Sequence, residues 1–304
     1  MIILITGITG QVGKVFVNII KPNDNKIIGL TRDINNSSLP GVDLYLWPKN
    51  KNEFSKFILD KKITHIVHLA GQSSVSSSFE EPSKTFNSNV ILTNLILSSL
   101  ELIKNPPFVY VALSSEMFGN PKSLPIREDT ERNPTSPYAH SKSIVYDIIS
   151  YYRKYSNIEI CGGITFNHES EFRDNRFFLK SLIQQSLNVY KGKSNKVVLG
   201  NLSVSRDFSD ANDVVKAIYM ILKNKKNKNF IICSGKSITL KDIQEYVFNR
   251  LKLPEEVLDI SPSLIRNLEI KRNYGDSSKI KEELGWCPES SIFKVIDRII
   301  DGMI

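Results

Sequence analysis

The stretch MIILITGITGQVGKVFVNII, residues 1–20, decides the fold class of this chain. It opens with an apolar run, which is typical of a strand that is buried on both faces of a parallel sheet. The pattern Gly7-x-x-Gly10-x-x-Gly13 follows directly, and apolar residues then recur at helical spacing. A strand, a glycine turn and a helix in this order predict a nucleotide-binding βαβ unit.

The next residues complete this unit. We expect Pro22-Asn23 to end the helix and Lys26–Leu30 to form the second strand. Glycines at the turn let the backbone approach a pyrophosphate, and the helix N-terminus supplies N–H groups and a favourable dipole. The residues of the turn that we expect to bind a dinucleotide cofactor are Gly7, Thr9, Gly10, Gln11, Val12 and Gly13.

The choice between NAD and NADP depends on the end of the second strand. A carboxylate there would bond the ribose 2′-OH of NAD, whereas an arginine suits the 2′-phosphate of NADP. The chain has Thr31-Arg32-Asp33 at this point. Arg32 therefore favours NADP as the cofactor, and Asp33 leaves NAD open.

Strand and helix patterns alternate through the first half of the chain, which indicates an α/β protein. Further strands are expected at Asp43–Trp47, Thr64–Ala70, Phe108–Leu113 and Ile158–Ile164. Helices are expected at Glu53–Leu59, at Phe86–Ile103 and from Pro137 onward. The predicted fold is thus a Rossmann-like doubly wound parallel sheet.

The strict alternation breaks down after residue 165. The second half carries helical patterns at Arg173–Tyr190, Ala211–Leu222, Leu240–Leu251, Lys279–Leu284 and Ile292–Ile300, and short strand patterns at Lys196–Leu199 and Phe230–Cys233. We therefore divide the chain into an NADP-binding domain, residues 1–165, and a smaller mixed substrate-binding lobe, residues 166–304. Strands in the range 196–235 are candidates to return to the first sheet.

Tyr138 and Lys142 are candidates for acid–base chemistry. They are four residues apart on the helix that opens at Pro137, so their side chains share a face. We expect the ammonium of Lys142 to favour the phenolate and to lower the pKa of Tyr138, which would let it exchange protons with an alcohol or a ketone. The alternative is an ordinary surface helix. Ser114 and Glu116 follow the fifth strand, at the edge of an open sheet where ligands bind.

Composition excludes several other classes. The chain has 304 residues, a net charge of +8 and an apolar content typical of a globular protein. No apolar run is long enough to span a bilayer, and the basic residues are spread through polar stretches such as 223–228, so we expect neither a membrane nor a nucleic-acid partner. Three separated cysteines, Cys161, Cys233 and Cys287, fit a reducing cytoplasm and predict no metal site.

The motifs together resemble the extended short-chain dehydrogenase/reductase family of nucleotide-sugar enzymes, over essentially the whole chain. The resemblance rests on Gly7-x-x-Gly10-x-x-Gly13, His68-Leu69-Ala70, Ser114, Tyr138-x-x-x-Lys142 and Arg206-Asp207-Phe208. It implies a Rossmann-like fold, a nicotinamide cofactor and a nucleotide-sugar substrate.

Within that family the chain is most similar to the GDP-mannose 4,6-dehydratases. The similar stretches are Gly7–Gln11, Gln72–Glu80, Phe166–Ser170, Leu199–Leu202 and Tyr274–Lys279. The chain departs from the dehydratase pattern at Ser114, where those enzymes usually have threonine. It also has Trp47-Pro48 where they have an acidic adenine contact, and a shorter segment after Arg32 than the one they use in tetramer contacts.

The resemblance assigns roles to individual residues. It implies that Ser114, Glu116, Tyr138 and Lys142 are catalytic, and that Leu69, Ala70, Tyr138 and Lys142 join the glycine turn and Arg32 in binding the cofactor. It further implies that Asn167 and Arg206 contact the diphosphate and base of the substrate, and we add Lys180 as a third candidate for substrate binding. We expect His168 to be structural, and the alternative for Arg206 is an ion pair with Asp207 or Asp210.

Several functions remain open at this point. The dehydratase interpretation predicts conversion of a GDP-hexose to its 4-keto-6-deoxy form through transient oxidation at C4, with Glu116 as the base at C5. The same Ser, Tyr and Lys would also serve an NADPH-dependent reductase of 4-keto-6-deoxy nucleotide sugars, or an epimerase. A non-catalytic NADP-binding sensor is a third class. Helices Phe86–Ile103 and Pro137–Tyr155 resemble the pair that forms the dimer interface in this family, which predicts a homodimer.

Overall fold

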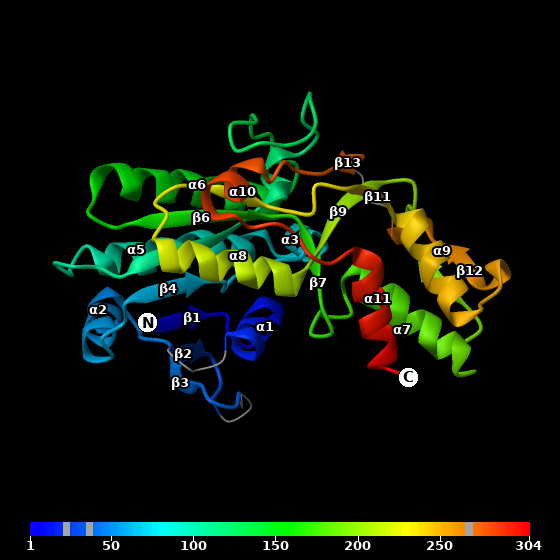
Figure 1. Cartoon of the computed structure of the whole chain (residues 1–304), viewed down its shortest axis with the longest axis horizontal. Helices are drawn as coiled ribbons and strands as arrows, with labels where there is room; N and C mark the ends of the chain where they lie inside the picture. The colour runs from blue at the N-terminus through cyan, green and yellow to red at the C-terminus, as the bar shows by residue number, and fades with distance from the viewer. Residues whose placement is uncertain (21–24, 35–38, 265–269) are drawn as a thin grey trace.

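Seven parallel strands form the central sheet of the computed structural model, which describes residues 1–20, 25–34, 39–264 and 270–304 (Figure 1). Their spatial order is β10 (Phe230–Ile232), β6 (Ile160–Thr165), β5 (Phe108–Ser114), β4 (His65–His68), β1 (Ile2–Thr6), β2 (Lys26–Thr31) and β3 (Asp43–Leu46). The order reverses between β1 and β4, which makes that point the topological switch where open sheets bind ligands. The predicted Rossmann-like doubly wound sheet is confirmed.

Helices cover both faces of this sheet. On one face, α1 (Gln11–Ile19) and α8 (Ala211–Asn224) bury their apolar sides against β1, β5 and β10. On the other face lie α2 (Lys51–Asp60), α5 (Leu92–Leu100) and α6 (Pro137–Tyr155) (Figure 1). Because both faces are covered, β1 and β5 are buried over nearly their whole length, as the continuous apolar run at the start of the chain predicts for β1.

One contact within the sheet is unusually close. The Tyr110 ring on β5 is fully buried and lies where a side chain at Gly163 of β6 would stand. A Cβ built at position 163 would overlap the Tyr110 hydroxyl and ring. Gly163 is therefore required by the space that the Tyr110 ring occupies, not by its backbone angles.

A second part of the molecule is built from the C-terminal half of the chain (Figure 1). Three helices, α7 (Phe178–Tyr190), α9 (Leu240–Leu251) and α11 (Ile292–Asp301), enclose its own apolar core. Strand β9 (Ser205–Asp210) is the centre of a small sheet with β7 (Asn167–Glu169), β11 (Ser237–Thr239) and β13 (Arg272–Asn273). The short elements that complete the described chain are α3 (Val75–Glu80), α4 (Pro82–Phe86), a π-helical turn (Asn87–Ile91), 3₁₀ turns at Ser115–Phe118, Glu255–Val257 and Pro262–Leu264, and α10 (Ser278–Leu284).

The two late strands that were candidates to return to the first sheet behave differently. Strand β10 returns and pairs in parallel with β6 at the edge of the central sheet. The strand predicted at Lys196–Leu199, which is β8 (Val197–Leu199), pairs instead with β12 (Leu258–Ile260). Val197 and Leu199 are buried in the core formed by α7, α9 and α11, and this burial keeps β8 in the C-terminal part.

Two helices differ from the prediction at their boundaries or in their interior. The helix predicted at Arg173–Tyr190 begins only at Phe178, because Asp174 holds a turn in front of it: its carboxylate accepts from the Arg176 N–H. The helix predicted at Phe86–Ile103 is correct in position but contains the π-helical turn. The predicted helix end at Pro22-Asn23 lies outside the described residues.

Candidate active site

The glycine turn after β1 forms a cradle against the end of β4. Gly7 has a φ of +73°, and a Cβ there would stand 2.7 Å from the amide nitrogen of Ala70. A Cβ at Gly13 would overlap the carbonyl of Ile8. Only glycine fits at both positions, and the open turn leads into the N-terminus of α1, where backbone N–H groups favour an anion. The cradle therefore fits the pyrophosphate of a dinucleotide, and it brings Leu69 and Ala70 beside the turn.

The end of β4 is held by side chains of neighbouring elements. The backbone N–H of Leu69 donates to the Thr6 carbonyl at 3.1 Å, and that of Ala70 reaches the Thr6 hydroxyl at 3.3 Å. His68 bonds Thr6 and Thr93 through its two ring nitrogens at 2.7 and 3.0 Å. Burial, together with the charge of Lys142, lowers the pKa of His68 to about 3, so it is a neutral structural residue.

Gln11 connects the glycine turn to the second half of the chain. Its side-chain amide donates to the His168 carbonyl at 2.8 Å. The ring of His168 bonds the Phe166 carbonyl at 2.8 Å through Nδ1, and burial lowers its pKa to about 4. These contacts give His168 a structural role, as the sequence predicts.

Arg32 lies at the carboxyl end of β2. Its side chain is exposed, directly after Thr31, whose hydroxyl bonds the backbone of Asp33. Arg32 thus lies at the sheet edge that carries the glycine turn.

Ser114 and Tyr138 are brought together from β5 and α6. The Ser136 hydroxyl caps α6 by accepting from the Ala139 N–H at 3.1 Å, and Pro137 occupies the first helical position, as predicted. This start aims Tyr138 at the end of β5, where its hydroxyl hydrogen-bonds to Ser114. Glu116 lies in the turn after Ser114, close enough for its charge to act on the Tyr138 phenol.

The predicted pKa shift of Tyr138 is wrong in direction. Burial, with a smaller contribution from the charge of Glu116, raises the pKa of Tyr138 to about 12. The hydrogen bond to Ser114 and the positive charge of Arg173 act in the opposite sense but do not offset burial. Lys142 is not among these causes, because its ammonium points to the sheet.

Lys142 is anchored to the strand below it. Its Nζ donates to the Ala112 carbonyl of β5 at 2.8 Å, and burial lowers its pKa to about 8. The side chain therefore lies on the Tyr138 face of α6, as its spacing predicts, and its ammonium donates to a backbone carbonyl.

Asn89 was not predicted and connects three parts of the site. It lies in the π-helical turn, where its Nδ2 donates to the Ser141 hydroxyl at 2.8 Å and to the Gln72 carbonyl at 3.0 Å. Ser141 in turn donates to the Tyr138 carbonyl at 2.7 Å. The extra residue of a π-helical turn re-aims one side chain, and such turns are frequent at functional sites. No spacing in a helical apolar pattern would have indicated it.

Arg173 is the second residue that the sequence did not single out. It was placed inside a helix, but it lies in the turn before α7, 3.6 Å from the buried Glu169 carboxylate. Its guanidinium stacks on the Phe177 ring at 3.5 Å, and its charge reaches Tyr138. Arg173 is thus the cation that favours the Tyr138 phenolate. The signal available in the sequence was an arginine shortly after a strand end.

The three predicted substrate residues lie around the small sheet. Asn167 is in β7 and partly exposed. Arg206 is in the neighbouring β9, nearly buried, and donates to the carbonyls of Ser205 and Ile270 at 2.9 and 2.7 Å. Lys180 is in α7, where its ammonium donates to the Glu171 carbonyl at 3.1 Å. Asn167 and Arg206 therefore share one sheet, whereas Lys180 is held from the side of the C-terminal helix.

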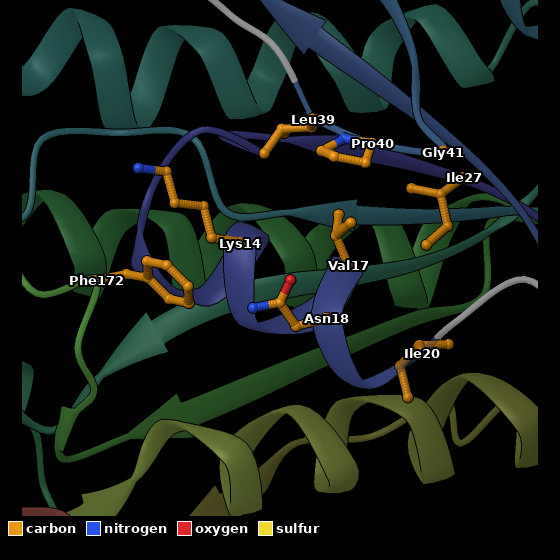
Figure 2. Close-up of a pocket in the computed structure, with 9 residues that line it drawn as sticks. All are labelled: Lys14, Val17, Asn18, Ile20, Ile27, Leu39, Pro40, Gly41 and Phe172. Carbon is orange, nitrogen blue, oxygen red and sulfur yellow. The ribbon is translucent and has the colours of Figure 1, made fainter. Parts of the chain in front are cut away.

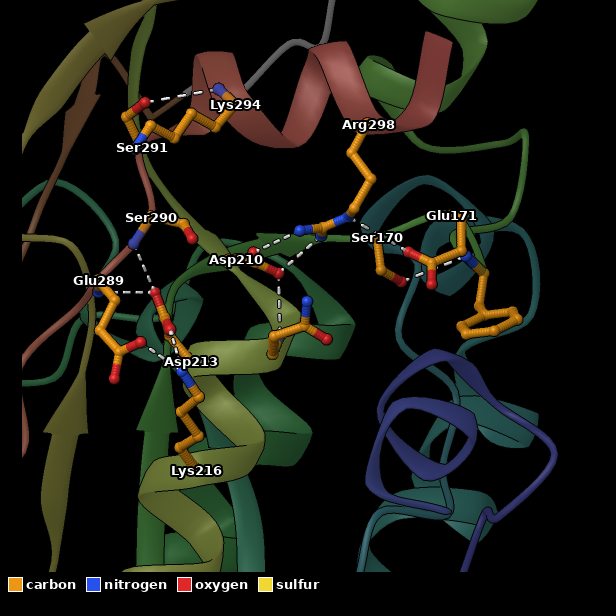
Figure 3. Close-up of polar contacts among 12 residues, drawn as sticks. Ser170, Glu171, Asp210, Asp213, Lys216, Glu289, Ser290, Ser291, Lys294 and Arg298 are labelled. Atoms are coloured by element: carbon orange, nitrogen blue, oxygen red, sulfur yellow. Dashed lines mark hydrogen bonds and ion pairs between the residues drawn. The ribbon is translucent and has the colours of Figure 1, made fainter. Parts of the chain in front are cut away.

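A charged network holds the segment between Asn167 and Lys180 (Figure 3). Arg298 of α11 makes two hydrogen bonds of 2.8 and 2.9 Å to the buried Asp210 carboxylate, and lies 3.8 Å from Glu171. Asp213, one turn along α8, accepts from the backbone N–H groups of Glu289 and Ser290. The C-terminal helix is thereby tied both to the start of α8 and to the turn that carries Arg173.

A pocket of about 550 Å³ lies elsewhere, on the outer side of α1 (Figure 2). It is lined mostly by apolar side chains, with Lys14 and Asn18 as its polar members: Lys14, Val17, Asn18, Ile20, Ile27, Leu39, Pro40, Gly41 and Phe172. None of the predicted site residues lines it, and we do not assign the chemistry to it.

Comparison with known proteins connects this geometry to a family. The family model described as GDP-mannose 4,6 dehydratase matches residues 4–299. The curated GDP-mannose 4,6 dehydratase 2 of Arabidopsis thaliana is 31% identical, over 99% of this chain and 86% of its own length.

In the part of the chain that is described, no helix is long and apolar enough to cross a membrane.

Two solved structures share the fold. The structure of RMD from Pseudomonas aeruginosa complexed with NADPH has a TM-score of 0.81 at 23% identity, and covers 99% of this chain and 97% of its own. The dTDP-glucose 4,6-dehydratase from Streptomyces venezuelae with NAD bound has a TM-score of 0.87 at 19% identity, and covers 99% and 96%. At these identities the likeness shows the fold.

Proposed function

This chain belongs to the GDP-mannose 4,6-dehydratase family, and from that premise we propose that it converts GDP-mannose to the 4-keto-6-deoxy sugar nucleotide with loss of water. The observation that carries the proposal is the convergence of Ser114, Tyr138 and Glu116 at the carboxyl end of β5. This places an alcohol-directed hydrogen-bonding pair and a separate carboxylate in one site. A dehydration needs both, because it handles one proton at an oxygen and another at a carbon.

A nicotinamide dinucleotide, when bound, supplies the oxidation at C4 and returns the same two electrons at C6. The residues that would hold it are the glycine turn with the N-terminus of α1, Leu69 and Ala70 at the end of β4, and Lys142. Arg32 supports NADP as the preferred form, because a guanidinium matches a phosphate dianion.

Tyr138 handles the proton of the sugar 4-hydroxyl. As phenolate it accepts this proton while the C4 ketone forms, and Ser114 donates a hydrogen bond that orients the same oxygen. Burial and Glu116 disfavour the phenolate, whereas Arg173 and the Ser114 bond favour it. We therefore infer that the reaction speeds up as the pH rises toward the Tyr138 pKa.

Glu116 handles the second proton. The C4 ketone acidifies the proton at C5, which the Glu116 carboxylate removes. The resulting carbanion expels the hydroxyl of C6, and the proton on Glu116 leaves with it as water. The C5 proton and the C6 hydroxyl leave as water, and the C4 hydrogen ends at C6. Atoms balance because C5 then regains one proton, which matches the proton that Tyr138 removed from the 4-hydroxyl.

Recognition of the nucleotide falls to the small sheet. We assign Asn167 and Arg206, on adjacent strands, to the GDP diphosphate and base, and Lys180 to the same ligand. The physical case for Arg206 is that a guanidinium matches the geometry of a phosphate. The alternative ion pairs are disfavoured because Asp207 accepts from Ser234 and Gly235, while Asp210 pairs with Arg298.

The test is incubation of purified protein with GDP-mannose and a catalytic amount of NADP. The expected product has lost one water, contains a 4-ketone and accumulates without net change in NADPH absorbance. If GDP-mannose is unchanged while a 4-keto-6-deoxy sugar nucleotide oxidises NADPH, the protein is a reductase and the dehydratase proposal fails. If neither reaction occurs but NADP binds, the sensor alternative replaces it.

We also propose a homodimer formed by α5 and α6. Ile91 and Leu102, which flank α5, are 53% and 51% exposed, and Tyr151 and Tyr155 of α6 are 58% and 65% exposed. The two helices lie side by side, with the Tyr152 hydroxyl 3.4 Å from the Asn94 side chain. A second copy would bury this apolar face in a four-helix contact. A monomeric mass in sedimentation equilibrium at micromolar concentration would remove the proposal.

A reducing cytoplasm is the compartment that we propose. Cys161 and Cys233 are buried free thiols, and Cys287 is an exposed one. An exposed free thiol is best preserved where thiols are kept reduced.

A further inference from the structure

Trp47 stands at the sheet edge where the adenosine end of a dinucleotide would lie. It follows β3 directly, and the parallel register pairs Thr31 of β2 with Leu46 of β3. Trp47 is therefore the neighbour, across the strands, of Arg32. A dinucleotide that places its pyrophosphate at the glycine turn and its 2′-phosphate at Arg32 brings its base next to these strand ends.

The indole of Trp47 is held in place and still accessible. It packs beside the fully buried Phe54 ring, with ring centroids 6.5 Å apart and planes 31° from each other. The side chain is only partly buried, so one portion remains open to a ligand. Its neighbours at the edge, Arg32 and Lys49, are exposed cations and suit a phosphate-bearing molecule.

The chemistry at this edge favours stacking over hydrogen bonding. Trp47 offers a π face, and Pro48 has no backbone N–H to donate to a ring nitrogen. Neither residue can accept a hydrogen bond from an exocyclic amine through its side chain. Stacking on an aromatic ring tolerates any base, because every base has a π face.

We propose that Trp47 is the platform for the adenine of the cofactor, and that the chain recognises this end by the 2′-phosphate and by stacking, without reading the exocyclic amine. This rests on the dinucleotide part of the proposed function. It assigns a specificity-determining residue and predicts a cofactor site tolerant of the base.

Tryptophan fluorescence offers a direct test, because the chain has two tryptophans. Trp286 is the internal control: it is 3% exposed and its indole N–H donates to the Asp213 carbonyl at 3.0 Å, in contact with α8 rather than with β3. Titration of the full chain with adenosine 2′,5′-bisphosphate should quench emission, whereas nicotinamide mononucleotide should not. In Trp47→Phe the quenching should disappear although calorimetry still detects binding.

Affinity gives the second readout. Trp47→Leu should bind adenosine 2′,5′-bisphosphate about 10- to 100-fold more weakly, which is the usual loss of one base–aromatic stack. Inosine 2′,5′-bisphosphate, which lacks the exocyclic amine, should bind the native chain within about 3-fold of the adenosine compound, since stacking is base-tolerant. Circular dichroism checks that both variants are folded. If Trp47→Leu does not fold, Trp47→Phe remains as the variant for the fluorescence test.

Three outcomes would overturn the inference: quenching that persists in Trp47→Phe, unchanged affinity in a folded Trp47→Leu, or clear discrimination against inosine. Each of these leaves GDP-mannose turnover by the native chain intact, so the proposed function would stand. A native chain that binds no dinucleotide at all would instead overturn the proposed function, and the inference with it.

Discussion

The sheet side of the site is held by backbone sterics and apolar burial, whereas its C-terminal side is held by buried carboxylates. On the sheet side, Gly7 and Gly13 let elements approach, and Ser114 and Tyr138 follow from where β5 ends and α6 begins. The Gly13 contact with Ile8 and the cap of α6 are local in the sequence, and Gly7 meets Ala70 at the end of β4. A single cap or glycine therefore sets the geometry.

On the C-terminal side, three acidic residues of one short segment bind distant partners. Asp207 accepts from the backbone N–H groups of Ser234 and Gly235, and Asp210 binds the Arg298 guanidinium. Asp213 accepts from two N–H groups just before α11. The substrate side is therefore held by polar contacts between residues that are far apart in the sequence. We expect substitutions on the two sides to have different effects for this reason.

The largest expected effect is on the sheet side. Tyr138→Phe removes the hydroxyl that exchanges the 4-OH proton, and turnover should fall by about 10³-fold or more, in the range of a lost general acid–base. Because the ring stays buried, thermal stability should change little. Rate measurement under saturating GDP-mannose, alongside a melting curve, checks both. Surviving turnover would remove the whole catalytic assignment.

Glu116→Gln should separate the two proton transfers. The C5 base is lost, so formation of the dehydrated product should fall by about 10²-fold, a typical loss for one acid–base group. Removing the charge that raises the Tyr138 pKa should also move the rise of the pH–rate profile to lower pH. Product analysis over a range of pH values measures both effects. An unshifted profile would mean that Glu116 does not act on Tyr138.

The C-terminal side should respond through stability and substrate affinity together. Arg298→Met leaves the buried Asp210 without its guanidinium and releases Glu171, and should lower the free energy of unfolding by about 2 kcal/mol, less than for a fully buried pair because Arg298 is partly exposed. The matched control is Arg250→Met, which removes ion pairs to the same helix α11 at partly buried Asp297 and exposed Asp301. That change should cost under about 1 kcal/mol.

Urea titrations of both variants measure this difference, and KM for GDP-mannose should rise only in Arg298→Met. Equal effects of the two substitutions would mean that the network is an ordinary surface contact, and the contrast between the two sides would lose its basis.

The last expected effect, which is the smallest of them at neutral pH, is a pH dependence that both sides share. Burial lowers the pKa of His68, on the sheet side, to about 3 and that of His168, on the C-terminal side, to about 4. The unfolded chain binds these protons from about pH 6.5 downward while the folded chain excludes them. Stability conferred by each neutral histidine is therefore present above pH 6.5 and is lost as the pH falls toward the folded value.

Each histidine should contribute a slope of about 1.4 kcal/mol per pH unit near pH 5. Urea unfolding between pH 4.5 and 7 should show a slope shallower by this amount in His68→Gln and, separately, in His168→Gln. A slope unchanged in either variant would mean that its histidine takes up the proton in the folded state.

The features that could be predicted from the sequence are those that depend on local pattern. The positions of most strands along the chain, the glycine turn and the face shared by Tyr138 and Lys142 depend on local pattern, so the sequence predicts them. Arg173 was misplaced because Asp174 forms a turn that interrupts an otherwise helical pattern. The predicted direction of the Tyr138 pKa shift was wrong because burial depends on all the residues packed around the ring, not on a neighbour four residues away.

Long-range polar contacts lie beyond such reasoning. Arg298 and Asp210 each look like ordinary surface residues in the sequence, and nothing in their spacing indicates that they meet. The hydrogen bond from Gln11 to the His168 carbonyl is of the same kind. The partner of such a residue can be identified only when the fold is known.

The close fit of Tyr110 over Gly163 has a consequence for sequence variation. Any residue larger than glycine at 163 meets the Tyr110 ring, so this position should accept only glycine in a mutational scan of the native chain. A smaller residue at 110 vacates that space and should make alanine acceptable at 163. The two positions, on neighbouring strands β5 and β6, are thus expected to vary together among descendants of this sequence, because the size of the residue at one limits the size allowed at the other.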